Sequence, residues 1–120
     1  MSGVRLVFYM DGRGAAPVKN WLDSLPERPY NKCVAKLELL ASHGTRLGPP
    51  SVKPLRDGIL ELGISESGNQ YRILFFYQPG KIVVLAHAFF KKQNKVPNRE
   101  IETAIKRKKA FEAGPEDHTY

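Results

Sequence analysis

The sequence predicts an α+β domain: a small antiparallel sheet of about four strands, with a helical hairpin on one face and a basic helix at the end. Three observations lead to this prediction. Two amphipathic helical patterns come first, three strand-like runs follow between residues 55 and 92, and a basic helical pattern comes last. Helices placed before and after the strands, rather than between them, are typical of α+β domains. At 120 residues, the chain suits one hydrophobic core.

The three strand-like runs form the centre of the predicted sheet. They are Ile59–Ile64, Gln70–Tyr77 and Lys81–Phe90. The last two are apolar at most positions on both faces, which indicates strands that are covered on both sides. Between them, Pro79-Gly80 predicts a tight turn, because proline presets the first central φ of a type II turn and glycine takes the positive second one. Val4–Met10 predicts one more strand, which we expect to pair with one of these three runs.

Two helices are predicted between the first strand and the other three. Pro17 begins the first helix, since proline is favoured at the first helical position. Its apolar stripe consists of Val18, Trp21, Leu22 and Leu25. The second helix is predicted to end near His43, before Gly44. Its apolar face is predicted to consist of Tyr30, Val34, Leu37 and Ala41. Both stripes are expected to pack against the sheet, and residues 45–54 are expected to form a loop.

A last helix is predicted to begin at Pro97 and to end at Gly114-Pro115. The side chains expected to face inward are those of Ile101, Ala104, Ile105 and Phe111. Residues 1–111 are therefore predicted to form one folded domain. Residues 112–120 are predicted to be a disordered acidic tail.

Positive charge is concentrated near the end of the chain. The whole chain carries a formal charge of +7, and residues 91–109 contain eight Lys or Arg against two Glu. A block of this kind suits a polyanionic partner such as nucleic acid, the ribosome or an acidic protein, although a solvated helix face would have the same composition. The single cysteine, Cys33, and the lack of an apolar run of membrane-spanning length or of a signal peptide predict a cytoplasmic protein with no membrane partner.

The motifs of the common catalytic sites are absent from the sequence. There is no glycine-rich phosphate loop, no C-x-x-C or H-E-x-x-H motif and no nucleophile elbow, and the three histidines are far apart. No metal and no cofactor are therefore predicted. Basic and polar side chains are sufficient for RNA cleavage without a metal ion. The reaction requires deprotonation of the 2′-OH, stabilisation of the phosphorane and departure of the 5′ oxygen, and such side chains can assist each of these steps.

Four polar residues that interrupt or end the apolar strands are the catalytic candidates. They are Arg72, His87, Lys91 and Lys92. Each has a structural alternative: an ion pair with Glu61 for Arg72, a hydrogen-bonded core histidine for His87, and ordinary solvation for the two lysines. Four further basic residues are candidates for RNA binding: Arg56, Lys95, Arg99 and Lys106.

Three segments in order resemble the RelE/ParE toxin superfamily, and in particular its phage-derived HigB-like branch. They are LRDGILEL at 55–62, YRILFF at 71–76 and HAFFKK at 87–92, followed by Pro97, Glu100-Ile101 and Ala104. The resemblance implies a RelE-like fold and a toxin of a type II toxin–antitoxin system that cleaves mRNA without metal, on the ribosome. It implies a helix-turn-helix antitoxin as partner. It also implies that Arg72 contacts the phosphate and that Lys91 and Lys92 are the basic residues after the last strand.

One departure from the branch affects the expected function. The branch has E-L-R where this chain has Glu61-Leu62-Gly63, so an arginine is missing beside Glu61 on the same strand face. Val96 also replaces a threonine that would cap the last helix, a loss of about 1 kcal/mol. The first change leaves open a cleavage-impaired relative that acts as an RNA-binding or antitoxin-binding regulator. A ParE-like gyrase poison is a third alternative, against which the HAFFKK segment at 87–92 argues.

Overall fold

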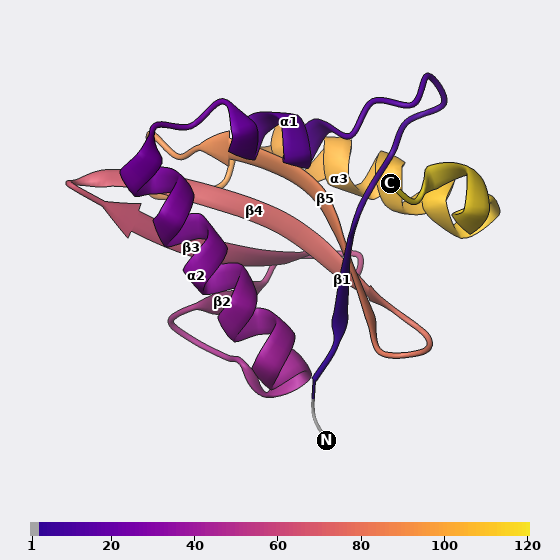
Figure 1. The fold of residues 1–120 in the computed structure, drawn as a ribbon, viewed down its shortest axis with the longest axis horizontal. Coiled ribbons are helices and arrows are strands. Elements are labelled where there is room, and N and C mark those ends of the chain that lie inside the picture. The colour runs from indigo at the N-terminus through magenta and orange to yellow at the C-terminus, as the bar shows by residue number, and fades with distance from the viewer. Residues whose placement is uncertain (1–2) are drawn as a thin grey trace.

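The computed structural model describes residues 3–120, and within them it contains one five-stranded sheet and three α-helices (Figure 1). The strands are β1 (Arg5–Phe8), β2 (Val52–Pro54), β3 (Leu60–Glu66), β4 (Asn69–Gln78) and β5 (Ile82–Phe90). The α-helices are α1 (Pro17–Asp23), α2 (Glu27–His43) and α3 (Asn98–Ala113). Two short 3-10 helices, η1 and η2, cover Gly44–Arg46 and Pro115–His118. The α+β class predicted from the sequence is confirmed.

The sheet has the strand order β1-β5-β4-β3-β2 and is mostly antiparallel. Two details differ from the prediction. β1 does pair with a later strand, but it lies parallel to β5, from which α1, α2 and the other three strands separate it along the chain. The fifth strand, β2, lies in the segment predicted to be a loop; with three residues and a terminal proline it is too short for any sequence pattern.

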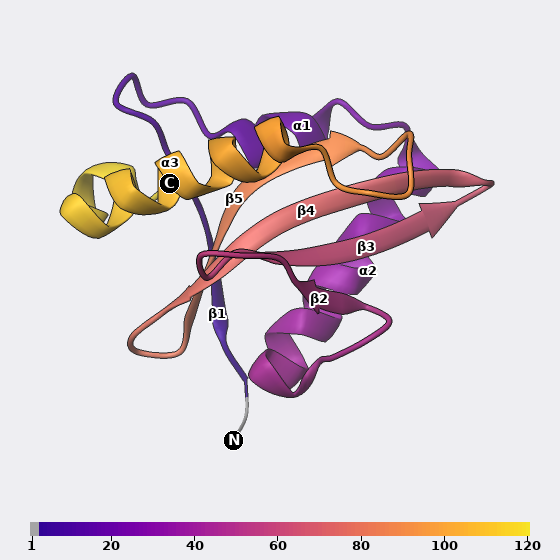
Figure 2. The same cartoon turned by 180° about the vertical axis from the view of Figure 1, so that it is seen from behind.

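The helices α1 and α2 cover one face of the sheet, and α3 covers the other (Figures 1 and 2). The predicted placement of the first two helices on one face is confirmed. In α1, Val18 and Leu22 are buried as predicted. In α2, the buried stripe is Cys33, Leu37 and Leu40, so the predicted face was wrong by part of a turn, and Tyr30 remains 38% exposed. Periodicity locates an apolar face only to within one residue when apolar residues stand side by side.

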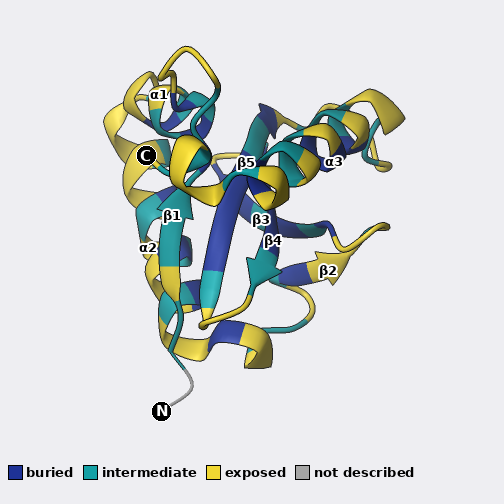
Figure 3. Cartoon of the chain, turned by 90° about the vertical axis from the view of Figure 1, so that its right-hand side faces the viewer, coloured by how far each residue is buried: buried dark blue, intermediate teal, exposed yellow. Residues whose placement is uncertain are grey.

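The helix α3 packs over β4 and β5 through the four side chains predicted to face inward. Ile101, Ala104, Ile105 and Phe111 are all buried there. They meet Ile59, just before β3, and sheet side chains that include Leu74, Phe76, Val84, Ala86 and Phe89. In Figure 3 the middle strands are mostly dark blue, while the outer sides of the helices are yellow. The central strands are therefore covered on both faces, as their apolar composition indicated.

A β-bulge in β5 changes which side chains face α3. Leu74 pairs with His87, but the next residue, Phe75, pairs with Leu85, so that Ala86 is an extra residue. Before the bulge Val84 faces α3, and after it His87 and Phe89 do. Because side chains alternate along a strand, the inserted residue moves every later side chain to the other face. Without the bulge, the side chains of His87 and Lys91 would point toward α1 and α2.

The end of the chain is ordered, so the prediction of a disordered tail was wrong. After α3 the chain turns through η2, and Thr119 forms an antiparallel bridge with Tyr9 (Figure 1). The His118 ring stacks on Tyr9 with centroids 5.4 Å apart, and its Nδ1 lies 2.7 Å from the carbonyl oxygen of Met10. The acidic composition suggested disorder, but aromatic and backbone contacts with the segment after β1 hold these residues in place.

Candidate functional site

The strongest candidate site is a cluster of charged side chains on the α3 face of the sheet, formed by Arg72, Glu61 and Lys91. The Arg72 Nε lies 2.8 Å from the Glu61 Oε2, and the Lys91 Nζ lies 3.3 Å from the same oxygen. The three side chains are 15%, 5% and 12% exposed, respectively. One buried carboxylate thus holds two cations side by side, and the ion pair considered for Arg72 from the sequence is present.

Neighbouring hydrogen bonds fix the guanidinium of Arg72 further. Its Nη1 donates to the carbonyl oxygen of Tyr71 at 2.8 Å, and its Nη2 donates to Gln70 Oε1 at 3.2 Å. Three of its nitrogens are therefore engaged, and the side chain is held in a single orientation before any ligand arrives. Pre-organisation of this kind lowers the cost of binding a phosphate group.

The cluster opens onto a polar hollow of about 470 Å³ at the start of β4 and the end of β5. Its lining consists of Gly68, Gln70, Arg72, Lys91, Lys92, Gln93 and Asn94. Lys92 is exposed and has no ion-pair partner within residues 3–120. Three of the four catalytic candidates from the sequence, Arg72, Lys91 and Lys92, therefore meet at one hollow with a net positive lining. A phosphate group is the ligand that such a lining suits.

Gly63 lies directly opposite Arg72 in the β3–β4 pair, on the same face. A Cβ atom added to Gly63 would lie 3.4 Å from Arg72 Cζ and 3.4 Å from Arg72 Nη1. The guanidinium of Arg72 therefore lies across the space into which a side chain at position 63 would extend. The arginine that the HigB-like branch has at this position would meet a like charge here and would compete with Arg72 for Glu61.

His87, the fourth catalytic candidate, is bound under α3 instead of facing the hollow. Its Nε2 lies 2.7 Å from Glu100 Oε1, and its Nδ1 lies 3.2 Å from the Arg107 Nη1, which also donates to the Ala86 carbonyl oxygen. Burial lowers the pKa of His87, the Glu100 carboxylate acts in the opposite direction, and the Arg107 charge lowers the pKa further. These contacts correspond to the hydrogen-bonded core histidine, the structural alternative for this residue.

Arg56 is held by ionic contacts with the start of α3. Its Nη2 lies 2.7 Å from Glu102 Oε1, its Nη1 lies 2.9 Å from Asp57 Oδ2, and it also donates to Asn98 Oδ1. Its side chain is 40% exposed. Arg56 thus connects the loop before β3 to α3, and its charge is largely compensated by the two carboxylates.

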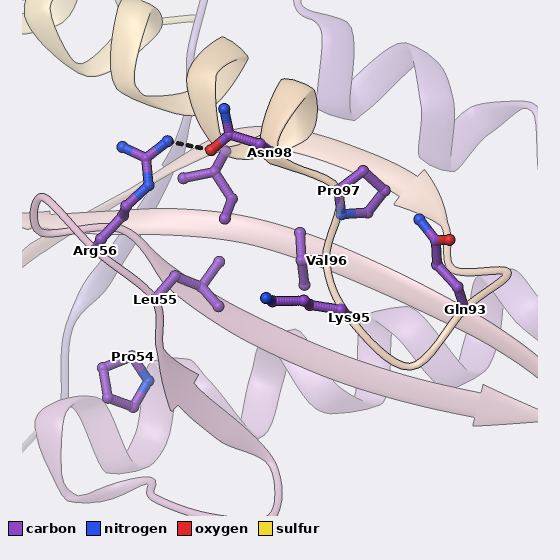
Figure 4. Close-up of a pocket in the computed structure, with 9 residues that line it drawn as sticks. Pro54, Leu55, Arg56, Gln93, Lys95, Val96, Pro97 and Asn98 are labelled. Carbon is purple, nitrogen blue, oxygen red and sulfur yellow. Dashed lines mark hydrogen bonds between the residues drawn. The ribbon is translucent and has the colours of Figure 1, made fainter.

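The other three RNA-binding candidates are exposed and do not form one group with the cluster. Lys95 lines an apolar hollow of about 610 Å³ between the loop before β3 and the start of α3, with Arg56 at one end (Figure 4). Arg99 lines a different hollow beside β5, and Lys106 is exposed on α3. All three hollows share Gln93, so the segment after β5 is where they meet.

Several residues that shape the site were not singled out from the sequence. They are Gln70, Asn98, Glu102 and Arg107. Each is an ordinary polar residue at an exposed-looking position of a strand or helix, and no local pattern distinguishes it. Their partners lie two to 46 residues away in sequence, so most of these contacts appear only once the strands and α3 are packed together.

Within the described part of the chain, no group of three or more His, Cys, Asp or Glu side chains is placed to hold a metal ion. Over the same residues, no helix is both long and apolar enough to cross a membrane. Neither observation identifies the ligand of the hollow. That the reaction is metal-independent stays a prediction from the sequence.

Comparison with known proteins gives one family and two curated relatives. The family described as "Phage derived protein Gp49-like (DUF891)" matches residues 20–109. Two proteins of Mycobacterium tuberculosis, from strains CDC 1551 / Oshkosh and ATCC 25618 / H37Rv, are both named "Probable endoribonuclease HigB1". Each is 37% identical over 103 residues, which cover 85% of this chain and 78% of the relative. The resemblance to the HigB-like branch is confirmed, and the chain belongs to the Gp49-like family of phage-derived proteins.

Proposed function

We propose that this protein is the toxin of a type II toxin–antitoxin pair and that it acts in the cytoplasm as a metal-independent endoribonuclease on mRNA. The observation that carries the proposal is the pair of cations, Arg72 and Lys91, held on one buried carboxylate at the mouth of a polar hollow. The names of the two mycobacterial relatives support the activity. The ribosome as the place of cleavage, and a helix-turn-helix antitoxin as the partner, rest on the family resemblance alone.

In the proposed reaction, the 2′ oxygen of one nucleotide attacks the adjacent phosphorus, and the bond to the 5′ oxygen breaks. Negative charge develops on the non-bridging oxygens of the phosphorane. Arg72 and Lys91 would stabilise that charge, and the exposed Lys92 would bind the same or the next phosphate. Glu61 is the positioning residue, because it holds both cations at fixed places without facing the substrate itself.

Proton transfer is the part of the reaction with the fewest candidate groups. His87 is occupied by Glu100 and Arg107 and lies under α3, so we do not assign it the role of acid or base. The hollow itself is lined by cations and amides. This observation favours a second candidate function, a cleavage-impaired relative that binds RNA or antitoxin and regulates through binding.

Inducible expression of the wild type beside Gly63→Arg separates the two candidates, with growth and the 5′ ends of mRNA measured together. The endoribonuclease predicts growth arrest and new, codon-phased 5′ ends with the wild-type protein. If only Gly63→Arg produces new ends, the wild type is the cleavage-impaired regulator. If the wild type arrests growth with DNA damage and intact mRNA, both candidates fail and a gyrase poison is supported.

A further inference from the structure

A third hollow, of about 420 Å³, lies at the edge of β5 and has no role in the reaction proposed above. β1 pairs with β5 only from Ile82 to Leu85, so the end of β5 has no strand neighbour on that side among residues 3–120. The walls of the hollow come from three elements. Trp21 lies on α1, Phe90 ends β5, and Arg99 and Glu100 begin α3.

Phe90 gives this hollow an aromatic surface that is both fixed and accessible. Its ring packs against Tyr71 and Trp21, with centroids 5.3 Å and 5.8 Å apart. Nevertheless, 51% of the residue is exposed. A phenylalanine held on one side and open on the other offers a flat apolar surface to a planar ligand. Unpaired nucleic-acid bases stack on such surfaces.

The charges around this ring distinguish a nucleotide from a simple anion. Lys92 and Arg99 line the hollow, and neither side chain has an ion-pair partner within residues 3–120. The Glu100 carboxylate lies in the same wall and would repel a lone phosphate. A ligand that combines an aromatic base with a phosphate at some distance from it uses the ring and the cations together, and can keep its phosphate away from Glu100.

The hollow is continuous with the site of the proposed reaction. Lys92 and Gln93 line both this hollow and the polar hollow that contains Arg72 and Lys91. A single strand whose phosphate lies at Arg72 would pass over these two shared residues to reach Phe90. No part of a duplex could do so while keeping its bases paired, since the ring can stack only on a base that has left its partner.

We propose that the hollow at the edge of β5 is a subsite for one unpaired base of single-stranded RNA, with Phe90 as the stacking surface and Arg99 as a phosphate contact. This inference rests on the proposed function in taking RNA as the ligand. An open strand edge could also receive a peptide strand. The unpaired cations and the continuity with the polar hollow favour RNA.

The single tryptophan of the chain lines this hollow, so its fluorescence reports directly on occupancy. The probe is a short 2′-O-methyl RNA, which cannot be cleaved because it has no free 2′-OH nucleophile. Titration at constant ionic strength is expected to change the fluorescence of Trp21. A second probe, with the same 2′-O-methyl sugar–phosphate backbone but without bases, is expected to bind about 10-fold more weakly than the first. This is the loss of affinity expected for one stacked base. Equal binding of the two probes would overturn the proposal.

Two variants with matched controls assign the effect to the subsite. Phe90→Leu keeps apolar contact with Trp21 and Tyr71 but removes the stacking surface, and we expect binding about 10-fold weaker than for Phe90→Tyr. Arg99→Gln is expected to reduce the salt dependence of RNA binding, relative to the wild-type protein, by the amount expected for about one phosphate contact. The matched control is Lys109→Gln, which removes an exposed charge elsewhere on α3 and is expected to leave the salt dependence unchanged. Wild-type binding by Phe90→Leu overturns the proposal.

The failure of this proposal is distinguishable from failure of the nuclease proposal, because the probe is not cleaved. If the wild type binds the probe through Phe90 but cuts no mRNA, the subsite stands and the nuclease proposal fails. If the wild type cuts mRNA and Phe90→Leu binds and cuts like the wild type, the nuclease proposal stands and the subsite proposal fails. If saturating RNA leaves the fluorescence unchanged, the hollow does not take RNA and the proposal is overturned.

Discussion

Two carboxylate-centred clusters lie on the same face of the sheet, and they differ in which of their side chains line a hollow. In the first, Glu61 holds Arg72 and Lys91; in the second, Glu100 binds His87, which also contacts Arg107. The first cluster lies where β4 begins and β5 ends, beside the polar hollow. The second cluster lies between β5 and α3, and the side chains of His87 and Glu100 are each 18% exposed.

The residue types of the two clusters do not distinguish them, but the hollow beside each cluster does: cations of the first line the polar hollow, whereas the second contributes the Glu100 carboxylate to the hollow at the edge of β5. The Arg72 cluster offers its cations to a ligand. The His87 cluster satisfies its own groups and fastens α3 to the sheet, since its contacts join residues 13 and 20 positions apart in sequence. Two similar sets of residue types therefore have different expected effects on cleavage and on stability, and the following substitutions test the difference.

The largest effect is expected from Arg72→Ala. Loss of the main phosphate contact is expected to reduce cleavage by about 100-fold or more, because charge on the phosphorane is no longer stabilised. Cleavage of a defined mRNA by purified protein measures the effect, with circular dichroism to check the fold. Because Glu61 would lose one partner, Arg72→Ala combined with Glu61→Gln serves as a control in which the unpaired carboxylate is neutral. Full cleavage by Arg72→Ala would contradict the assignment.

A smaller effect is expected from Lys91→Met, which retains the apolar stem of the side chain. We expect cleavage to fall by about 10-fold, because one of the two fixed cations is lost while Arg72 still neutralises Glu61. The free energy of unfolding should change little for the same reason. A fall in cleavage equal to that of Arg72→Ala would show that the two cations act as one unit. Unchanged cleavage would remove Lys91 from the site.

His87→Gln is expected to change the pH dependence of stability but not cleavage. Burial lowers the pKa of His87 below its ordinary value of 6.5, so the unfolded chain binds the proton more readily than the folded one. Stability is therefore complete above about pH 6.5 and decreases as the pH falls through the ordinary value toward the lowered one. Thermal unfolding between pH 5 and pH 8 should show this decrease in the wild type and less of it in His87→Gln.

Cleavage by His87→Gln is the measurement that compares the two clusters directly. We expect it to stay within about threefold of the wild type, since the residue lies away from the polar hollow. A large loss of cleavage, accompanied by loss of the limb of the pH–rate profile that reports an imidazole, would instead make His87 an acid or base.

The smallest effect is expected from Gly63→Ala. The added Cβ would be in ordinary contact with the Arg72 guanidinium, at 3.4 Å, and alanine removes the entropic cost of a glycine inside a strand. We expect the free energy of unfolding to change by less than about 1 kcal/mol, with cleavage retained. Chemical denaturation and the cleavage assay measure both. Loss of cleavage without loss of stability would show that Arg72 must move across Gly63 when RNA binds.

Much of the fold followed from local patterns. The strands β3, β4 and β5, the limits of α2 and α3 near Gly44 and Gly114, and the inward residues of α3 all agree with the sequence prediction to within a few residues. The turn after β4 also lies where Pro79-Gly80 placed it, although Lys81 joins Gly80 in the positive-φ region and β5 begins one residue later than predicted. These features depend on periodicity and on the φ preferences of proline and glycine, which act within a few residues.

The features that sequence reasoning missed depend on contacts between distant residues. The parallel pairing of β1, the short strand β2, the rotated stripe of α2 and the docked tail each require a partner element to be in place. The same is true of the candidate site. The residue types of Arg72, His87, Lys91 and Lys92 were sufficient to make them candidates, but not to show which of them share a hollow.

The amino-acid sequence by itself determined the class of fold, the apolar centre of the sheet, the basic surface of α3 and the family resemblance, because composition, periodicity and motif order are all local properties. Only the tertiary structure decided the arrangement of the site. One extra residue in β5, Ala86, moves each side chain that follows it to the other face, so that His87, Phe89 and Lys91 lie on the face of α3. That shift of register brings Lys91 to Glu61 and Arg72 and sends His87 to Glu100, and register is set by the packing of whole strands.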